Sequence, residues 1–297
     1  MVKTRNQQQQ GLVNTALFSN DIVFKFASYL SPNDMVSLAL SSRKYVSLVE
    51  EAARRQFQEI ATGAERNVLP RYDGESWIAL YRQLEIMRSP LFFDYLVGCE
   101  IGYDGRDKSR LTVEPLAPEY NYNSALANQV MRGGKHFATF RFYTGTNVGI
   151  IRPIQRWDED GYGGGEEGWG LHYFSPMQLV FHEKLLAERT DRWGESNTHW
   201  CVYSSHDGLR CSCDWENVPG IAENWDSGTG RANVLLRERA HIGLLLDLDE
   251  GTLTVYKDGR RLGVIQDGLT GEYCWFTEIP CEAGGEVTIS RGEPPAA

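Results

Sequence analysis

The sequence contains no apolar run that approaches the roughly 18 residues of a membrane-spanning helix. Its first residues, MVKTRNQQQQGLVNTAL, lack the long apolar stretch of a secretory signal peptide. Cysteine is also scarce, with six in 297 residues and no spacing typical of a disulfide framework. These absences predict a protein of the cytoplasm or the nucleus, where thiols stay reduced.

Signatures of catalysis are missing too. There is no G-x-S-x-G, P-loop, H-E-x-x-H or protein-kinase motif. The Gly-rich stretch DEDGYGGGEEGWG at 158–170 could suggest a phosphate cradle, but it has no lysine and its acidic residues repel phosphate. We therefore expect a chain that is not an enzyme, with no catalytic residue and no cofactor, and we interpret this stretch as an acidic loop.

Positive charge is scarce after the first third of the chain. Residues 1–97 hold 11 Lys and Arg and 10 Asp and Glu, out of totals of 30 and 40, so residues 98–297 hold 19 and 30, a net charge of −11. Phosphate backbones and anionic lipids both attract basic surfaces. We therefore expect neither nucleic acid nor a membrane among the partners.

One segment, HWCVYSSHDGLRCSC, collects residues that zinc favours: His199, Cys201, His206, Cys211 and Cys213. Their spacing fits no common zinc knuckle. If Asp207-Gly208 is a two-residue hairpin turn, Cys213 lies opposite Val202 on the face that holds Cys211, and Cys201 points to the other face. A longer loop would change which residues share a face, so this argument alone does not decide against zinc. The sequence favours buried thiols over a metal site.

The stretch HIGLLLDLDEGTLTVYKDGRRLG at 241–263 contains an acidic cluster, Asp247, Asp249 and Glu250, that could suggest a calcium site. Counted from Asp247, the glycine that an EF-hand loop needs at its sixth position comes one residue early, as Gly251. The flanking residues alternate as strands do, and 249–251 and 257–260 have the composition of hairpin turns. We expect a three-stranded meander without a metal.

Helical patterns fill the first part of the chain. Apolar residues recur at three- and four-residue steps in 17–30, in the segment after Pro32, in 41–57 and in 77–87, with a polar linker at 61–73. Ser19 or Asn20 suits the first N-cap, and Ser31 before Pro32 suits the second helix start. This pattern predicts three short helices followed by a fourth.

From about residue 98 the pattern changes to short β-prone segments separated by turn residues. These segments are 137–143, 199–204, 211–216, 242–248, 252–256 and 286–290. Segment 182–193 is expected to form a helical turn or an ordered loop. The sequence thus predicts a disordered tail at 1–11, a small all-α region at 12–97 and an all-β antiparallel sandwich at 98–292.

The meander resembles the C-terminal signature of the SPRY (B30.2-like) family, VGVxLDLDxGTLxFYKNGxxLG followed by GLxGxxYP. The chain reads IGLLLDLDEGTLTVYKDGRRLGVIQDGLTGEYCWF over this region. RGGKHFATFRF with VGIIRPI, and VYSSHDGLRCSCDWEN, match two further blocks more weakly. The chain departs from the family in a long insert at 155–197 and in YCWF, which lacks the usual proline. The C-terminal part is also similar to uncharacterised algal and diatom SPRY proteins.

The N-terminal helices resemble an F-box, the three-helix motif LPxExxxxIFxYLxPxDLxxLxxVxRxW. The chain has LFSNDIVFKFASYLSPNDMVSLALSSRKY, and the matching residues are Leu17, Ile22, Phe26, Leu30, Pro32, Asp34, Leu38 and Arg43. Phe18 replaces the expected proline, and Tyr45 replaces the tryptophan one position late. The resemblance implies that Leu17, Ile22, Phe26, Leu30, Pro32 and Leu38 bind a Skp1-like adaptor.

Together the two resemblances imply a substrate receptor of a Skp1–cullin–F-box ubiquitin ligase, a non-catalytic subunit that acts by holding its target near the enzyme. SPRY loops would bind an unidentified target protein. We expect the exposed anchors in Arg156, Trp157, Tyr162, Trp169 and Tyr173.

Three alternatives stay open. Some of these aromatic residues could close the open end of the core. The chain could be a SPRY interaction module without any link to ubiquitin, whose helices only pack as structure. A metal-dependent hydrolase is the least favoured reading.

Overall fold

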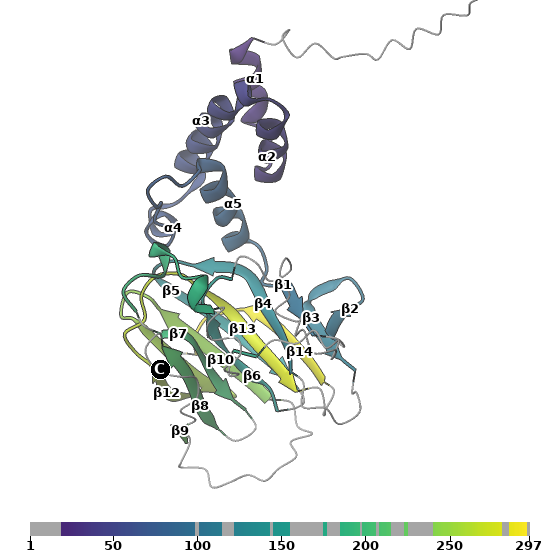
Figure 1. Cartoon of the computed structure of the whole chain (residues 1–297), viewed down its shortest axis with the longest axis vertical. Helices are drawn as coiled ribbons and strands as arrows, with labels where there is room; N and C mark the ends of the chain where they lie inside the picture. The colour runs from purple at the N-terminus through teal and green to yellow at the C-terminus, as the bar shows by residue number, and fades with distance from the viewer. Residues whose placement is uncertain are drawn as a thin grey trace, which may run out of the picture. The chain divides into compact units, whose positions relative to one another are not determined.

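The computed structural model describes residues 19–98, 101–114, 122–142, 145–154, 175–176, 185–196, 198–205, 208–214, 223–224, 240–280 and 285–295 (Figure 1). The chain divides into two compact units. We call Met1–Ala61 with Gly74–Arg82 the helical unit, and Thr62–Asp73 with Gln83–Ala297 the sandwich unit.

The helical unit contains α1 (Asn20–Ala27), α2 (Pro32–Ser41), α3 (Arg43–Ile60) and the start of α5 (Trp77–Arg88). The side chain of Ser19 accepts a hydrogen bond from the N–H of Ile22, and Ser31 accepts one from the N–H of Asp34. Pro32 stands at the first position of α2, where its missing N–H costs nothing. The predicted helices and both helix starts are confirmed.

The core of the helical unit is built around α3, on which α1 and α2 both pack. The buried residues on these helices recur at helical spacing: Val23, Ala27, Met35, Tyr45, Val49, Ala52, Ala53 and Phe57. Glu50 ties α3 to α5, because its carboxylate accepts hydrogen bonds from Ser76 Oγ at 2.5 Å and from the N–H of Trp77 at 2.7 Å. A carboxylate at a helix N-terminus satisfies free N–H groups and complements the helix dipole.

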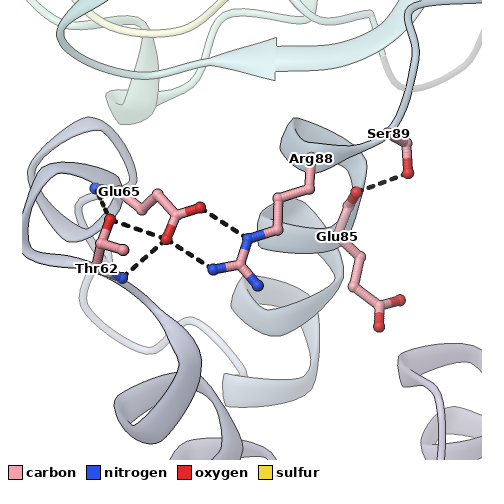
Figure 2. A network of polar contacts seen from close by, with 5 residues as sticks. All are labelled: Thr62, Glu65, Glu85, Arg88 and Ser89. Carbon is pink, nitrogen blue, oxygen red and sulfur yellow. Dashed lines mark hydrogen bonds and ion pairs between the residues drawn. The ribbon is translucent and has the colours of Figure 1, made fainter.

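The expected polar linker at 61–73 contains a helix, α4 (Gly63–Val68). The signal for it was present, since Thr62 and Glu65 form a capping box in which each side chain accepts from the other's N–H. The Glu65 carboxylate also accepts hydrogen bonds from Arg88 Nε at 2.7 Å and from Arg88 Nη2 at 2.8 Å (Figure 2). The bond from Arg88 holds the pKa of Glu65 at about 2, far below its ordinary range.

Segment Thr62–Asp73 packs on the rest of the sandwich unit and therefore belongs to that unit. Val68 lies against the backbone of Gly134, where a Cβ would come within 2.2 Å of Val68 Cγ1. The guanidinium groups of Arg132 and Arg192 lie 5.1 and 5.2 Å, respectively, from the centroid of the Tyr72 ring. Cation–π contacts of this kind stabilise by about 0.5–2 kcal/mol each.

The sandwich unit contains two antiparallel sheets, each with seven strands in the described part of the chain. The first sheet runs β1 (Phe93–Val97), β4 (Tyr122–Met131), β13 (Tyr273–Pro280), β6 (Asn147–Ile151), β7 (Thr198–Ser204), β8 (Leu209–Asp214) and β9 (Glu223–Asn224). The second runs β12 (Arg260–Gln266), β11 (Thr252–Lys257), β10 (Ala240–Asp247), β5 (Lys135–Phe142), β14 (Gly285–Arg291), β3 (Asp107–Val113) and β2 (Ile101–Asp104). The predicted fold class, an all-β antiparallel sandwich with an N-terminal all-α segment, is confirmed.

The core of the sandwich lies between the two sheets. Residues of both sheets alternate into it, as His136, Ala138, Phe140 and Phe142 do on β5. The ring of Phe140 meets Trp275 edge-on across the interface, with centroids 6.4 Å apart. The opposite face of the first sheet, which we call the outer face, is also buried and apolar. It carries Leu126, Ile151, Trp200, Val202, Cys211, Cys213, Cys274 and Phe276, with Ile154 and Leu185 packed among them.

The predicted meander is confirmed as β10, β11 and β12. Asp247 pairs with Thr252 and Lys257 pairs with Arg260, so both turns fall where the sequence placed them. Asp258 and Gly259 both have positive φ, 51° and 81°. This is the conformation that a two-residue hairpin needs and that the Asp-Gly pair supplies.

The observed units differ from the expected boundary at residue 97. Residues 93–97 were assigned to the helical region, whereas they form β1 and pair with β4. Segments Thr62–Asp73 and Gln83–Val97 also belong to the sandwich unit.

Candidate functional site

Large apolar side chains stand exposed on the helical unit. Nine such residues are exposed in the described part of the chain, and six of them lie between Ile22 and Val46. The most exposed are Leu40 at 82% and Tyr29 at 79%, followed by Phe26 at 57% and Ile22 at 55%. A concentration of exposed apolar residues in so short a stretch marks a surface that another molecule covers.

Two helices each present an apolar ridge one turn long. On α1 the residues four apart are Ile22 and Phe26, and on α2 they are Val36 and Leu40. We call these four residues and Tyr29 the apolar face.

The inward side of α1 is apolar as well, since Val23 and Ala27 are buried. Phe24 is half-buried, with the guanidinium of Arg55 4.7 Å from its ring centroid. A surface helix of a free-standing domain has one apolar stripe, and a helix that is apolar on two sides is covered on both. The inner side of α1 meets α3, and its outer side, with Ile22 and Phe26, is exposed among the described residues.

The expected adaptor-binding residues fall into four groups. Ile22 and Phe26 are exposed on α1, and Leu30 and Leu38 are half-buried. Pro32 is buried at the start of α2, where it shapes the helix. Leu17 lies outside the described residues. The structure therefore brings two of the six together on the apolar face and adds Tyr29, Val36 and Leu40, which the motif match did not single out.

The expected target-binding residues lie outside the described residues: Arg156, Trp157, Tyr162, Trp169 and Tyr173. The chain just before them is described, and it contains an arginine that is fully buried, Arg152. It follows β6 directly, at the start of the segment that holds the expected residues.

Arg152 donates all of its recorded side-chain hydrogen bonds to backbone carbonyls. Its Nε reaches Thr198 at 3.2 Å, Nη1 reaches Thr270 at 2.7 Å and Glu272 at 3.0 Å, and Nη2 reaches Ser196 at 3.2 Å. Its guanidinium lies 3.9 Å from the ring centroid of Tyr273.

Burial lowers the pKa of Arg152 to about 10, so the side chain stays charged at neutral pH. Burial also raises the pKa of Tyr273 to about 12, and its hydroxyl donates to the Thr198 carbonyl at 2.9 Å. This group of residues joins the end of β6 to the starts of β7 and β13, three neighbouring central strands of the first sheet. Because the four bonds that Arg152 makes to described residues all go to the main chain, we interpret it as a structural residue.

The cysteine-rich hairpin has the expected faces and a different register. Val202 pairs with Cys211 and Trp200 pairs with Cys213, two positions away from the expected pairing. The prediction of a two-residue turn was wrong, because β7 ends at Ser204 and β8 begins at Leu209. Since the shift is two residues, the faces are kept, and Cys211 and Cys213 lie on the outer face.

Cys201 points into the core between the sheets, away from the other two cysteines, as expected. Burial raises the pKa of its thiol. Within the described residues, no three His, Cys, Asp or Glu side chains come together closely enough to hold a metal ion. Of the helices described, none is long and apolar enough to cross a membrane.

The acidic cluster at 247–250 supports the hairpin. Asp247 Oδ1 accepts from the N–H of Asp249 and of Glu250, both at 3.2 Å, and Oδ2 pairs with Lys135 Nζ at 2.9 Å. Asp249 Oδ1 accepts from the N–H of Gly134 at 3.1 Å. Burial by itself would raise the pKa of Asp247, but the bonds from Lys135 and the two backbone groups outweigh it and lower the pKa.

We expect Asp247→Ala to lower the free energy of unfolding by about 1–2 kcal/mol at pH 7, because two backbone donors lose their acceptor. Asp247→Asn keeps an oxygen acceptor and is expected to cost about 0.5 kcal/mol, the value of an exposed ion pair. Urea unfolding measures both. The lowered pKa means that the carboxylate stabilises the fold at neutral pH and that this contribution is lost as the pH falls through that pKa. A stabilising effect of calcium on the wild-type chain would contradict the hairpin interpretation.

Comparisons with known proteins return structural neighbours only. No family model and no curated protein matches the chain. Among solved structures, the SPRY domain of human HERC1 is 14% identical over 62% of this chain and 89% of that chain, with a TM-score of 0.35. The TRIM65 PSpry domain is 14% identical over 69% and 95%, with a TM-score of 0.38. The carbohydrate-binding module CBM66 from Bacillus subtilis is 7% identical over 66% and 92%, with a TM-score of 0.35. These neighbours concern the sandwich architecture alone, since one fold hosts many functions.

Sequence reasoning missed Arg152, although a signal was present. The segment VGIIRPI places one arginine directly after a strongly apolar strand, and an arginine in such a context must bury its charge with hydrogen-bonding partners. The partners themselves lie 44 to 120 positions away and leave no local pattern.

Proposed function

We propose that this chain is a non-catalytic protein-interaction protein in which the helical unit binds a Skp1-like adaptor through its apolar face. The sandwich unit would hold a target protein by loops at one end, so that the whole chain acts as a substrate receptor of a Skp1–cullin–F-box ubiquitin ligase in the cytoplasm or nucleus. Its contribution would be proximity, since tethering raises the effective concentration of target lysines near the ligase.

The observation that carries this proposal is the apolar face. Ile22 and Phe26 match apolar positions of the F-box motif and are more than half exposed, although α1 already has a packed inner side. More than half of each side chain stays uncovered by the residues that the structure describes, and a partner helix or groove would bury it. The resemblance of α1–α3 to an F-box supplies the chemistry of that partner, an adaptor with an apolar surface.

The SPRY-like meander and the sandwich architecture support the second half of the proposal. The sandwich unit has an apolar core on each side of its first sheet, and the buried Arg152, at the end of β6, is hydrogen-bonded to backbone carbonyls. Recognition on such a scaffold belongs to its loops, whose ends are fixed while their sequences vary. Arg156, Trp157, Tyr162, Trp169 and Tyr173 remain the proposed anchors.

The test is binding of the full chain to a purified Skp1-like adaptor, measured by calorimetry. The double variant Ile22→Asp with Phe26→Asp is expected to weaken binding by about a hundredfold or more, because a charge at each position would have to be buried in the interface. Both residues are largely exposed, so the variant is expected to melt within a few degrees of the wild type.

Val264→Asp is the matched control. Val264 is an apolar residue on β12 with 38% exposure, and it lies in the sandwich unit. This variant is expected to bind the adaptor within about threefold of the wild type, since surface changes away from an interface have effects near 0.5 kcal/mol. A wild-type chain that does not bind the adaptor would leave the alternative, an interaction module without a link to ubiquitin.

A further inference from the structure

One carboxyl group is buried on the outer face of the first sheet, and no cation from the part of the chain that the structure describes acts on it. Glu278 on β13 is fully buried, and its neighbours across the sheet are Ser124 on β4 and Asn147 on β6. It is the only charged residue on these three strands. The strands on either side of these three are β1 and β7. β1 carries Asp94, which is exposed. β7 carries His199, which lies at the opposite end of the strand from Ser204, the residue that pairs with Asn147.

Two neutral groups act on this carboxyl. Asn147 Nδ2 donates to Glu278 Oε2 at 2.7 Å, and the hydroxyl of Ser175, itself fully buried, is the second polar group. Thr277 Oγ1 donates to the backbone carbonyl of Asn147 at 3.2 Å and fixes that residue in place. Glu278 Oε1 is buried without a hydrogen-bonding partner among the residues that the structure describes.

This environment suits a neutral acid and penalises a carboxylate. An ionised carboxyl taken out of water needs a cation or several hydrogen bonds, and one amide is too little. Burial raises the pKa of Glu278 to about 7, and the nearby Ser175 hydroxyl and the hydrogen bond from Asn147 offset only part of that effect. Above that pH, the ionised carboxylate of Glu278 is stabilised at the lowest free-energy cost if water enters the region and hydrates it.

We propose that Glu278 is a proton-controlled clasp, whose neutral form keeps the outer face closed around Asn147 and Ser175 and whose ionised form opens this region to water. This proposal is independent of the adaptor and of the ubiquitin ligase. It gives the sandwich unit a conformational response to pH changes in the physiological range.

The sign of the pH dependence follows from proton binding. The closed form binds the proton of Glu278 up to about pH 7, whereas the open form releases it near the ordinary value of 4.5. The closed form is therefore favoured at low pH, and this advantage is lost as the pH rises through that window. Between pH 6 and pH 8 the opening equilibrium is expected to grow by about tenfold.

The experiment is hydrogen–deuterium exchange of the full chain at pH 6 and pH 8, corrected for the intrinsic exchange rates. Peptides from β13 and β6 are expected to show about tenfold more opening at pH 8. Glu278→Gln keeps the oxygen that Asn147 contacts and has no proton to lose, so the increase is expected to vanish. Asp94→Asn, which removes the nearby exposed carboxylate on β1, is expected to keep it.

Two results would overturn the proposal: equal opening of the wild type at both pH values, or a tenfold increase that persists in Glu278→Gln. If Glu278→Gln does not fold, the carboxyl carbon of Glu278 can be followed by NMR in the wild type. A titration midpoint near pH 7 is the expected result, and a midpoint below pH 5 would be incompatible with the clasp.

Discussion

Replacing Arg152 by methionine is expected to lower the free energy of unfolding by about 4 kcal/mol, or to prevent folding, because four hydrogen bonds to backbone carbonyls are lost together. The desolvation cost of the charge disappears with the guanidinium, which favours the variant. The loss of these four hydrogen bonds outweighs that gain, since a buried carbonyl that loses its donor costs about 1–3 kcal/mol, although Thr198 keeps the bond from the Tyr273 hydroxyl. Thermal melting should fall by roughly 10 °C.

Two further variants separate the loss of the hydrogen bonds from the loss of the positive charge. Arg152→Lys keeps the charge but has one ammonium instead of a planar fork, so it can reach only part of a carbonyl set that spans two chain segments, 196–198 and 270–272. It is expected to recover little stability. Arg141→Met changes an exposed arginine on β5 and is expected to have an effect within about 0.5 kcal/mol. A stability loss below 1 kcal/mol for Arg152→Met would show that water replaces the guanidinium at no cost.

Gly149→Ala is expected to be equally severe, at about 3 kcal/mol or more, through close contact of the backbones of β6 and β7. A Cβ at this position would lie 2.0 Å from the carbonyl oxygen of Cys201 and 2.7 Å from Cα of Val202. Both atoms are main chain, so no side chain can move aside, and the strands must separate. The yield of folded protein and its urea midpoint measure this effect.

Gly102→Ala is the matched control for this variant. Gly102 lies on β2, at the edge of the second sheet, and a Cβ there meets no atom within 4 Å. The change should be neutral or slightly stabilising, because alanine restricts the unfolded chain more than glycine does. Similar losses for both variants would mean that flexibility of the backbone, and not the close approach to Cys201, explains the need for glycine.

Local signals in the sequence predicted much of the fold. The N-caps Ser19 and Ser31 and the turn at Asp258-Gly259 are each decided by a few neighbouring residues, and all three are confirmed. Register across a longer loop is not local. The hairpin of β7 and β8 has its expected faces but pairs two positions away, because a four-residue connection preserves the parity of the strands.

The candidate sites were predicted less completely, for a physical reason. The apolar ridge of Ile22 and Phe26 follows from spacing along one helix and could be predicted. Arg152 and Glu278 owe their properties to burial and to partners on distant strands, which no single segment shows. Tyr29 and Leu40 look like ordinary core residues in the sequence, and only the packing of α1 and α2 on α3 leaves them outside.

The order of the strands also determines when the sandwich can form during synthesis. β13 lies between β4 and β6 in the first sheet, and β14 lies between β5 and β3 in the second. Neither sheet is continuous until these two strands, the last in the chain order, have left the ribosome. Until then each sheet is two separate pieces with unpaired strands at the break, the kind of edge that associates with other chains. A chain truncated before Tyr273 would therefore lose the middle of both sheets, and with it the whole sandwich.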